Sequence, residues 1–308
     1  MKKSKVTIVG AGYVGASVVY ALVLCNVCDE IVFVNRNVDK AKSEIDDIRH
    51  GFPFVGKTQV KVGNYCDCED SQVIVIATGR NRKPGESRLD LAYENSNIVK
   101  ANIDQIKEYY KNAVILIVTN PIDVITYKVS KWMNVPYGKV FGTGCILDSS
   151  RFVRQLADYF QVDISDVRAT VIGEHGEGQV LLWSNVLICG KSIHEYCENN
   201  NKIWNEEIKM SIEDKVRNMG MSIIAHKGRT QYGIATCTAD IINAILNNKM
   251  ISVSVSSLID GDFGIQGVSI SLPVTIGING IENKNKIDIS DDEKKMLIAS
   301  AEKIKKYL

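Results

Sequence analysis

The sequence predicts an α/β fold in which a doubly wound parallel sheet is followed by a second, α+β domain. Short runs rich in Val and Ile alternate with longer helical patterns in the first half of the chain. Most of these runs carry Val and Ile on all faces, as is typical of strands buried on both faces of a parallel sheet. After about Leu147 the alternation gives way to long polar helices. The 308 residues suffice for two domains that share a cleft, and we expect a division into residues 1–145 and 146–308.

The strands expected in the first domain precede polar segments that suit ligand binding. In doubly wound sheets a ligand binds at the carboxyl ends of the parallel strands. Thr78 and Gly79 follow one expected strand, and Thr119 and Asn120 follow the next. We therefore expect these two segments to meet at the ligand. The expected strands are residues 6–9, 31–34, 60–62, 73–77, 114–118 and 140–141.

The second half carries fewer and less regular elements. The pattern predicts a helix over residues 148–160, strands over 180–189 and 268–278, and an amphipathic helix at the C-terminus. Ser290 and Glu293 have the spacing of a capping box at the start of that last helix. Its apolar residues fall on one stripe, which we expect to be packing surface: Leu297, Ala301, Ile304 and Leu308.

A glycine-rich turn follows the first expected strand. Gly10, Gly12 and Gly15 form a G-x-G-x-x-G pattern. The first glycine allows the tight turn, the second lets the backbone approach a pyrophosphate, and the third lets a helix pack closely on the strand. The helix N-terminus then presents N–H groups to the phosphates. With a strand before it, a helix over residues 16–27 and a second strand beyond, the turn predicts a Rossmann domain that binds NAD or NADP.

The end of the second strand departs from the usual pattern of NAD-binding domains. An Asp or Glu normally stands there and binds the adenosine ribose hydroxyls, whereas this chain has Asn35 and then Arg36. A neutral amide does not repel a 2′-phosphate, and the guanidinium could pair with one. Alternatively, Asn35 binds the ribose hydroxyls and Arg36 is a solvated surface charge. Both NAD and NADP therefore remain expected cofactors.

Composition argues against several other classes of protein. A net charge of +1 gives no electrostatic basis for binding nucleic acid or a membrane surface. The most apolar stretch, residues 13–28, is too short for a membrane span. Cys25 and Cys28 lack partners at zinc-ligand spacing, so we expect no metal site and buried, reduced thiols in this segment. No secretory signal pattern is present, and we expect a cytoplasmic protein.

Four later segments carry chemically active residues in a fixed order: residues 82–91, 118–121, 142–151 and 173–177. Together with the glycine-rich turn and the segment Lys227-Gly228-Arg229-Thr230, they resemble the lactate/malate dehydrogenase family along essentially the whole chain. The resemblance implies an enzyme that transfers a hydride between a nicotinamide cofactor and a small 2-keto or 2-hydroxy acid. It also implies a homo-oligomer, either a tetramer or a dimer.

The resemblance implies acid–base roles for His175 and Asp148. Imidazole suits a proton donor because it titrates near neutral pH. Asp148 would orient the imidazole and stabilise its cation, and it also suits the N-cap of the helix that follows. The remaining histidines stand in polar contexts where we expect structural or solvated side chains: His50, His194 and His226.

The remaining site residues are implied to bind the substrate. Arg151 would bind its carboxylate through two parallel hydrogen bonds, and its spacing from Asp148 places both on one helix face. Arg88 would polarise the ketone oxygen once its loop closes. Asn120 would bond the same oxygen and the nicotinamide side of the cofactor, with a cis peptide to Pro121. Thr230 would line the substrate pocket.

Substrate choice within the family depends on the position of Arg82. A Gln there accompanies lactate, and an Arg accompanies malate, whose second carboxylate it pairs. Glu86, Glu174 and Thr230 instead resemble the lactate branch. We expect a lactate dehydrogenase-like enzyme, with malate dehydrogenase activity as the alternative. A third hypothesis, a non-catalytic dinucleotide sensor, is disfavoured because every charged catalytic position is filled.

Overall fold

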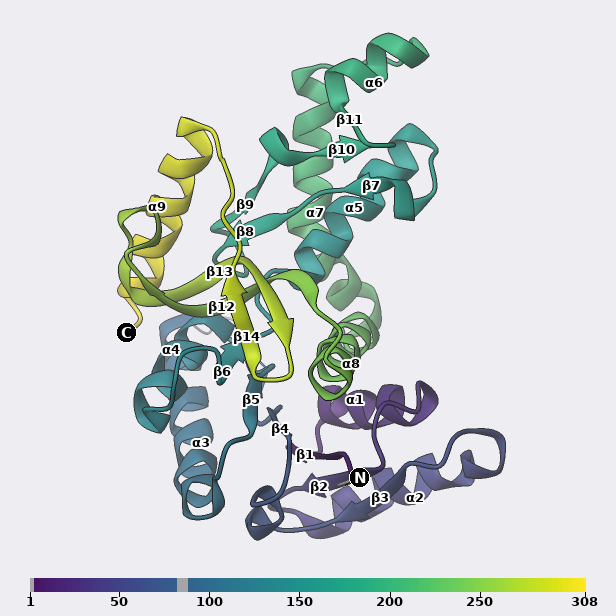
Figure 1. Ribbon diagram of the computed structural model, residues 1–308, viewed down its shortest axis with the longest axis vertical. Coiled ribbons are helices and arrows are strands. Elements are labelled where there is room, and N and C mark those ends of the chain that lie inside the picture. Colours follow the sequence, from purple (N-terminus) through teal and green to yellow (C-terminus); the bar gives the residue numbers. More distant parts are fainter. Residues whose placement is uncertain (1–2, 82–87) are drawn as a thin grey trace.

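The computed structural model describes residues 3–81 and 88–308 (Figure 1). Six parallel strands form its N-terminal half, each pairing through evenly spaced backbone hydrogen bonds. Their spatial order confirms the predicted doubly wound sheet: β3 (Gln59–Val62), β2 (Glu30–Val34), β1 (Lys5–Val9), β4 (Val73–Ile76), β5 (Val114–Ile117) and β6 (Val140–Gly142).

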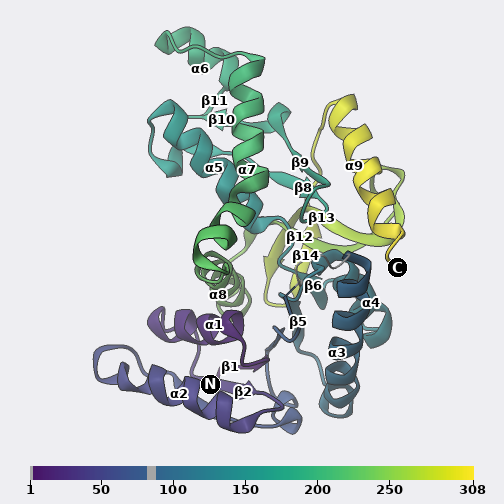
Figure 2. The same ribbon diagram turned by 180° about the vertical axis from the view of Figure 1, so that it is seen from behind.

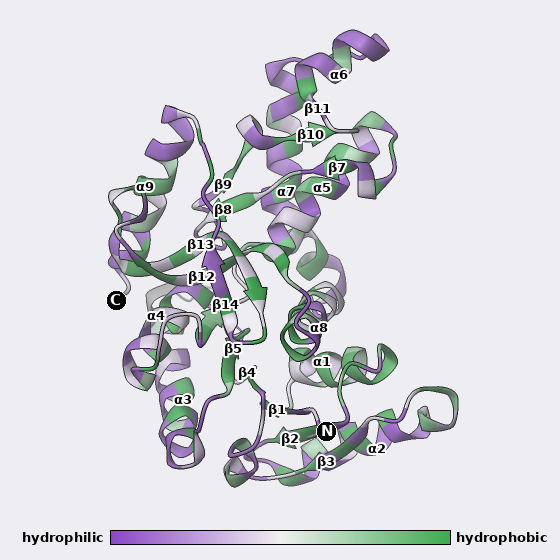
Figure 3. Ribbon diagram, in the orientation of Figure 1, coloured by the Kyte–Doolittle hydropathy of each residue, from purple (hydrophilic) through white to green (hydrophobic). Residues whose placement is uncertain are grey.

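Helices cover both faces of the parallel strands (Figures 1 and 2). One face packs against α1 (Tyr13–Leu24), α2 (Val38–His50) and, from the second half of the chain, α8 (Tyr232–Asn247). The other packs against α3 (Arg88–Tyr109) and α4 (Ile122–Met133). Because neither face meets water, the strands carry Val and Ile on both sides. Figure 3 shows these strands as largely hydrophobic.

The same sheet continues into the C-terminal half as antiparallel strands. After β6 come β12 (Ile251–Asp260), β13 (Gln266–Gly277), β8 (Val171–Gly173) and β9 (Gln179–Leu181), with β14 (Gly280–Lys284) also on β13. A smaller sheet joins β11 (Lys191–Ser192), β10 (Leu187–Ile188) and β7 (Val167–Arg168). Besides α8, the helices described in this half are α5 (Ile146–Phe160), α6 (Ile193–Asn200), α7 (Glu206–Lys227) and α9 (Asp291–Lys305).

Several details differ from the sequence-based expectations. The strand expected over residues 180–189 is split into β9 and β10 by a 3-10 turn at Trp183–Asn185. Strand β12 was not predicted, although its serines and valines alternate. The capping box of α9 is present, but Leu308 is 39% exposed and does not extend the buried stripe. Cys25 ends α1 and is exposed, so its predicted burial was wrong; Cys28 is buried.

All eight cysteines are free thiols. Among the described residues, no helix has the length and apolar character that crossing a membrane requires. Helix α6 and much of α7 are hydrophilic and project from the body of the molecule (Figure 3).

Candidate active site

The glycine-rich turn between β1 and α1 leaves open space at the helix N-terminus. Gly10 has a φ of +118°, and a Cβ on it would lie 2.7 Å from the Ala77 carbonyl carbon. A Cβ on Gly15 would lie 2.0 Å from the carbonyl oxygen of Gly10. A Cβ on Gly12, by contrast, would meet nothing within 4 Å, and no side chain caps α1. The turn therefore fits a pyrophosphate held by backbone N–H groups at the helix N-terminus.

Asn35 joins this turn to the end of β2. Its side-chain oxygen accepts a hydrogen bond from the Ala11 N–H at 3.1 Å, and its amide donates to the Asn37 carbonyl at 2.8 Å. Arg36 is exposed. Asn35 thus lies beside the glycine-rich turn, where we expect the adenosine ribose, and Arg36 follows it in the chain.

The segments after β4 and β5 meet, as their positions predict. The Thr119 hydroxyl donates to the Thr78 carbonyl at 2.7 Å. Gly79 has a φ of +156°, and a Cβ there would lie 2.8 Å from the Thr119 methyl group. The buried Asn95 amide of α3 donates to the Asn120 carbonyl at 2.7 Å. The exposed Asn120 side chain stands at this edge, and its peptide bond to Pro121 is cis, as expected.

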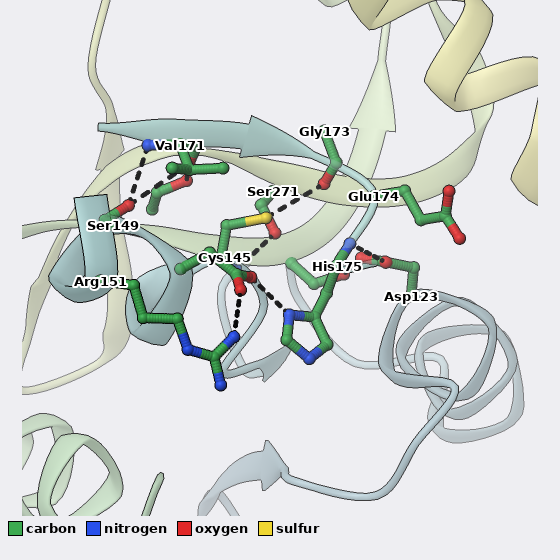
Figure 4. A network of polar contacts seen from close by, with 12 residues as sticks. Asp123, Cys145, Ser149, Arg151, Val171, Gly173, Glu174, His175 and Ser271 are labelled. Carbon is green, nitrogen blue, oxygen red and sulfur yellow. Dashed lines mark hydrogen bonds and ion pairs between the residues drawn. The ribbon is translucent and has the colours of Figure 1, made fainter. Parts of the chain in front are cut away.

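His175, Asp148 and Arg151 form one contact group, and Figure 4 shows the side chains of His175 and Arg151 near each other. His175 lies in the turn between β8 and β9, and its Nδ1 is 2.5 Å from Oδ2 of Asp148. Nη1 of Arg151 donates to Oδ1 of the same carboxylate at 2.8 Å. The Asp148 side chain is only 2% exposed, against 24% for that of His175. The buried carboxylate thus holds both cations, while the imidazole still reaches the site.

The predicted N-cap role of Asp148 is wrong. Helix α5 begins at Ile146, with Cys145 at the N-cap and no side-chain cap bond. Asp148 is therefore inside the first turn, where an acidic side chain suits the positive end of the helix. Both of its oxygens are directed at His175 and Arg151 instead of at backbone N–H groups.

The electrostatics of this group favour a charged imidazole. Burial raises the pKa of Asp148, but the charges and hydrogen bonds of His175 and Arg151 outweigh it and hold that pKa below its usual value. The pKa of His175 is raised, chiefly by the charge of Asp148, against the opposing effect of burial. The arrangement therefore favours the protonated imidazole.

Asp123 of α4 was missed by the sequence interpretation. It is 2% exposed, and its Oδ2 accepts a hydrogen bond from the main-chain N–H of His175 at 2.9 Å. The Ser256 hydroxyl of β12 donates to Oδ1 at 2.6 Å. Burial raises the pKa of Asp123 to about 6. The only local signal for Asp123 in the sequence is its position among the apolar residues that begin α4.

The turn that carries Thr230 contacts the cofactor turn. Helix α7 ends at Lys227 with Gly228 as its C-cap, at a φ of +83°, and Thr230 is half-buried. Between them, the Arg229 guanidinium lies 3.7 Å from the centre of the Tyr13 ring, next to Gly12. The second half of the chain thus touches the expected phosphate site directly.

Two predicted site residues have no described side chain. Arg82 lies outside the described residues. Arg88 is the first residue of α3, and only its backbone is described. Their roles in substrate choice and ketone polarisation therefore rest on the sequence.

Comparison with known proteins agrees with this geometry. Residues 4–142 match the family model for the lactate/malate dehydrogenase NAD binding domain, and residues 145–308 match that for the alpha/beta C-terminal domain. The chain is 38% identical to L-lactate dehydrogenase 1 of Clostridium acetobutylicum over 307 residues, covering 100% of this chain and 98% of that protein. It is 39% identical to L-lactate dehydrogenase of Thermoanaerobacterium saccharolyticum over 290 residues, covering 94% and 93%.

Solved structures give the same result. A lactate dehydrogenase from a Medee basin deep-sea metagenome library superposes with a TM-score of 0.95 at 33% identity, covering 100% of this chain and 98% of that one. The minor L-lactate dehydrogenase of Enterococcus mundtii gives a TM-score of 0.95 at 32% identity, with the same coverage. The two family models together span nearly the whole chain, and this protein belongs to the lactate/malate dehydrogenase family.

Proposed function

We propose that this enzyme reduces a small 2-keto acid to the L-2-hydroxy acid with NADH, as a lactate dehydrogenase-like oxidoreductase. The observation that carries the proposal is the group of His175, Asp148 and Arg151, which supplies a proton donor and a carboxylate anchor together. A reduced nicotinamide held at the glycine-rich turn would supply the hydride that the ketone carbon needs. The ketone oxygen then takes a proton from His175.

His175 is oriented for this role by its contact with Asp148. A carboxylate only accepts hydrogen bonds, so Nδ1 carries a hydrogen, and Nε2 is left to hold the transferred proton. Arg151 uses Nη1 to bind Asp148, and its remaining N–H groups are available for the substrate carboxylate. Arg88 and Asn120 would bind the ketone oxygen, and Thr230 would line the pocket.

The cofactor proposal concerns the binding of NAD and, separately, the tolerance of NADP. Membership of the family and the NAD binding domain match support NAD. We infer that NADP is also tolerated, because Asn35 is neutral and Arg36 is exposed beside it. Gly10, Gly12 and Gly15, with Thr78 and Gly79, would surround the rest of the dinucleotide.

The named relatives favour pyruvate as the substrate, and Arg82 favours a second carboxylate. The test is a panel of keto acids, pyruvate and oxaloacetate among them, assayed with NADH and NADPH in wild type and Arg82→Gln. We expect wild type to reduce oxaloacetate measurably and Arg82→Gln to shift the ratio of kcat/KM towards pyruvate. Pyruvate would leave the Arg82 guanidinium without a carboxylate partner, which costs roughly 2–5 kcal/mol where such a charge is desolvated. If pyruvate already dominates and the ratio is unchanged in Arg82→Gln, the oxaloacetate candidate is wrong.

We also propose a homo-oligomer, a tetramer or a dimer, which fits the exposed Met210, Met221 and Ile224 of α7. Light scattering of the purified protein measures this state directly. The domain division at residues 1–145 and 146–308 and the cytoplasmic location remain predictions. Limited proteolysis and cell fractionation would test them.

A further inference from the structure

Asp123 connects three segments that meet at the active site. It lies in the first turn of α4, three residues after Asn120. Its carboxylate accepts the main-chain N–H of His175 and the hydroxyl of Ser256 on β12. Figure 4 shows the carboxylate facing the backbone of the His175 turn. One buried side chain therefore fixes the distance between the Asn120 loop and the histidine.

The charge of Asp123 also acts on the imidazole. From α5, Asp148 and Arg151 face His175, and Asp123 faces it from α4. The charge of Asp148 raises the pKa of His175 most, Asp123 adds in the same direction, and Arg151 opposes them. Burial raises the pKa of Asp123 most, the Ser256 and His175 bonds lower it, and the charge of Glu174 raises it further. Above a pH of about 6, Asp123 is therefore negative and favours the protonated imidazole.

We propose that Asp123 is a positioning residue, which holds the His175 turn against the Asn120 loop and favours the charged form of the imidazole. The proposal rests on the proposed role of His175 as the proton donor. Asp123 is then a second carboxylate that acts on this histidine, beside Asp148. It binds the main-chain N–H of His175, and its charge raises the pKa of the imidazole. Asp123 is not required to touch the substrate.

The Asp123→Asn variant removes the negative charge of the side chain and keeps its shape. Its amide oxygen can accept the His175 N–H, and its NH₂ group can donate to the Ser256 hydroxyl, which rotates to accept. The contacts are retained and the negative charge is lost. The pKa of His175 should fall by roughly 0.5–1 unit, which is modest because Asp148 remains.

A matched control exists at the start of α9. Glu293 is also buried, and it also accepts a main-chain N–H and a hydroxyl, both from Ser184. The Glu293→Gln variant therefore removes a comparable buried carboxylate outside the His175 group. We expect it to lose stability to a similar degree but to leave the pKa of His175 unchanged.

The direct readout is an NMR titration of the imidazole signals in the full-length protein bound to NADH. The chain has only four histidines, and His50, His194 and His226 are exposed, so they serve as internal references. The His175→Asn variant assigns the fourth signal. A lowered pKa in Asp123→Asn alone supports the proposal. An equal pKa in wild type, Asp123→Asn and Glu293→Gln overturns it.

Two further measurements keep the test decisive. Ser256→Ala retains the carboxylate but removes a bond that lowers its pKa, so the His175 pKa should shift in the same direction by a smaller amount. This variant replaces Asp123→Asn if the latter does not fold.

The titration needs no substrate, so its outcome is independent of whether the protein reduces keto acids. With turnover present, the alkaline limb of kcat/KM for reduction should move to lower pH in Asp123→Asn only.

Discussion

Replacing Asp148 with Asn tests the electrostatic design of the candidate site. The carboxylate accepts charge-assisted bonds from His175 at 2.5 Å and from Arg151 at 2.8 Å. A hydrogen bond to a charged group exceeds a neutral one by about 1–1.5 kcal/mol. Losing the charge at both bonds therefore costs about 2–3 kcal/mol. The share of this cost that falls on the transition state lowers kcat/KM, by at most roughly 30- to 150-fold.

The pH profile should change along with the rate. Asp148 is the largest contributor to the raised pKa of His175, so that pKa falls when the charge is removed. Reduction needs the protonated imidazole and is lost as the pH rises through this pKa, so the alkaline limb moves to lower pH in Asp148→Asn. The assay is initial-rate keto-acid reduction with saturating NADH across pH.

The control variant lies on the same helix. Asp158 pairs with Arg154 at 2.8 Å, but both side chains are exposed. Asp158→Asn should therefore leave kcat/KM and the pH profile unchanged. If Asp148→Asn behaves like Asp158→Asn, the carboxylate does not control His175, and the electrostatic reasoning is refuted.

Three other perturbations follow from the structure. Arg151→Leu should raise the KM for the keto acid far more than the Kd for NADH, because the substrate carboxylate loses its bidentate partner; equal losses in both would contradict this. Asn35→Asp should lower kcat/KM with NADPH more than with NADH, since the new charge repels a 2′-phosphate; a strong wild-type preference for NADH that Asn35→Asp leaves unaltered would argue against NADP tolerance. Because the folded pKa of His175 is raised, its ion pair stabilises the fold fully below a pH of about 6.5 and loses this effect as the pH rises through the folded value. Urea unfolding of wild type and His175→Asn should therefore show a stability difference that shrinks with rising pH, and a constant difference would contradict the linkage.

Local patterns were sufficient for the parallel half of the fold. Both faces of that sheet are covered, so its inner strands are rich in Val and Ile and differ clearly from the segments around them. The glycine spacing has a partly local cause, since a Cβ on Gly15 would clash with the carbonyl oxygen of Gly10 in the same turn. The antiparallel half was harder. Strand β12 has serines between its valines, and at least Ser254, Ser256 and Ser257 are buried among neighbouring elements.

Site residues that belong to a family motif could be predicted from the sequence. Residues whose role depends on a contact with a distant part of the chain could not. The pairing of Asp148 with Arg151 follows from helix spacing, whereas its contact with His175 joins positions 27 residues apart. Asp123 acts on a turn 52 residues away and on a strand 133 residues away. No local periodicity encodes such separations. The start of α5 was misplaced for another reason: its N-cap is Cys145, and Cys is not a usual N-cap residue.

The central claim, that this chain is a keto-acid reductase with His175 as its proton donor, is tested most directly by turnover of wild type and His175→Asn. NADH consumption is followed with pyruvate and with oxaloacetate, alongside NADH binding by fluorescence. The structure predicts turnover by wild type and a loss of about 10²–10⁴-fold in the variant, with NADH binding retained. Near-normal turnover by His175→Asn, or NADH binding by wild type without reduction of any keto acid, would contradict the claim.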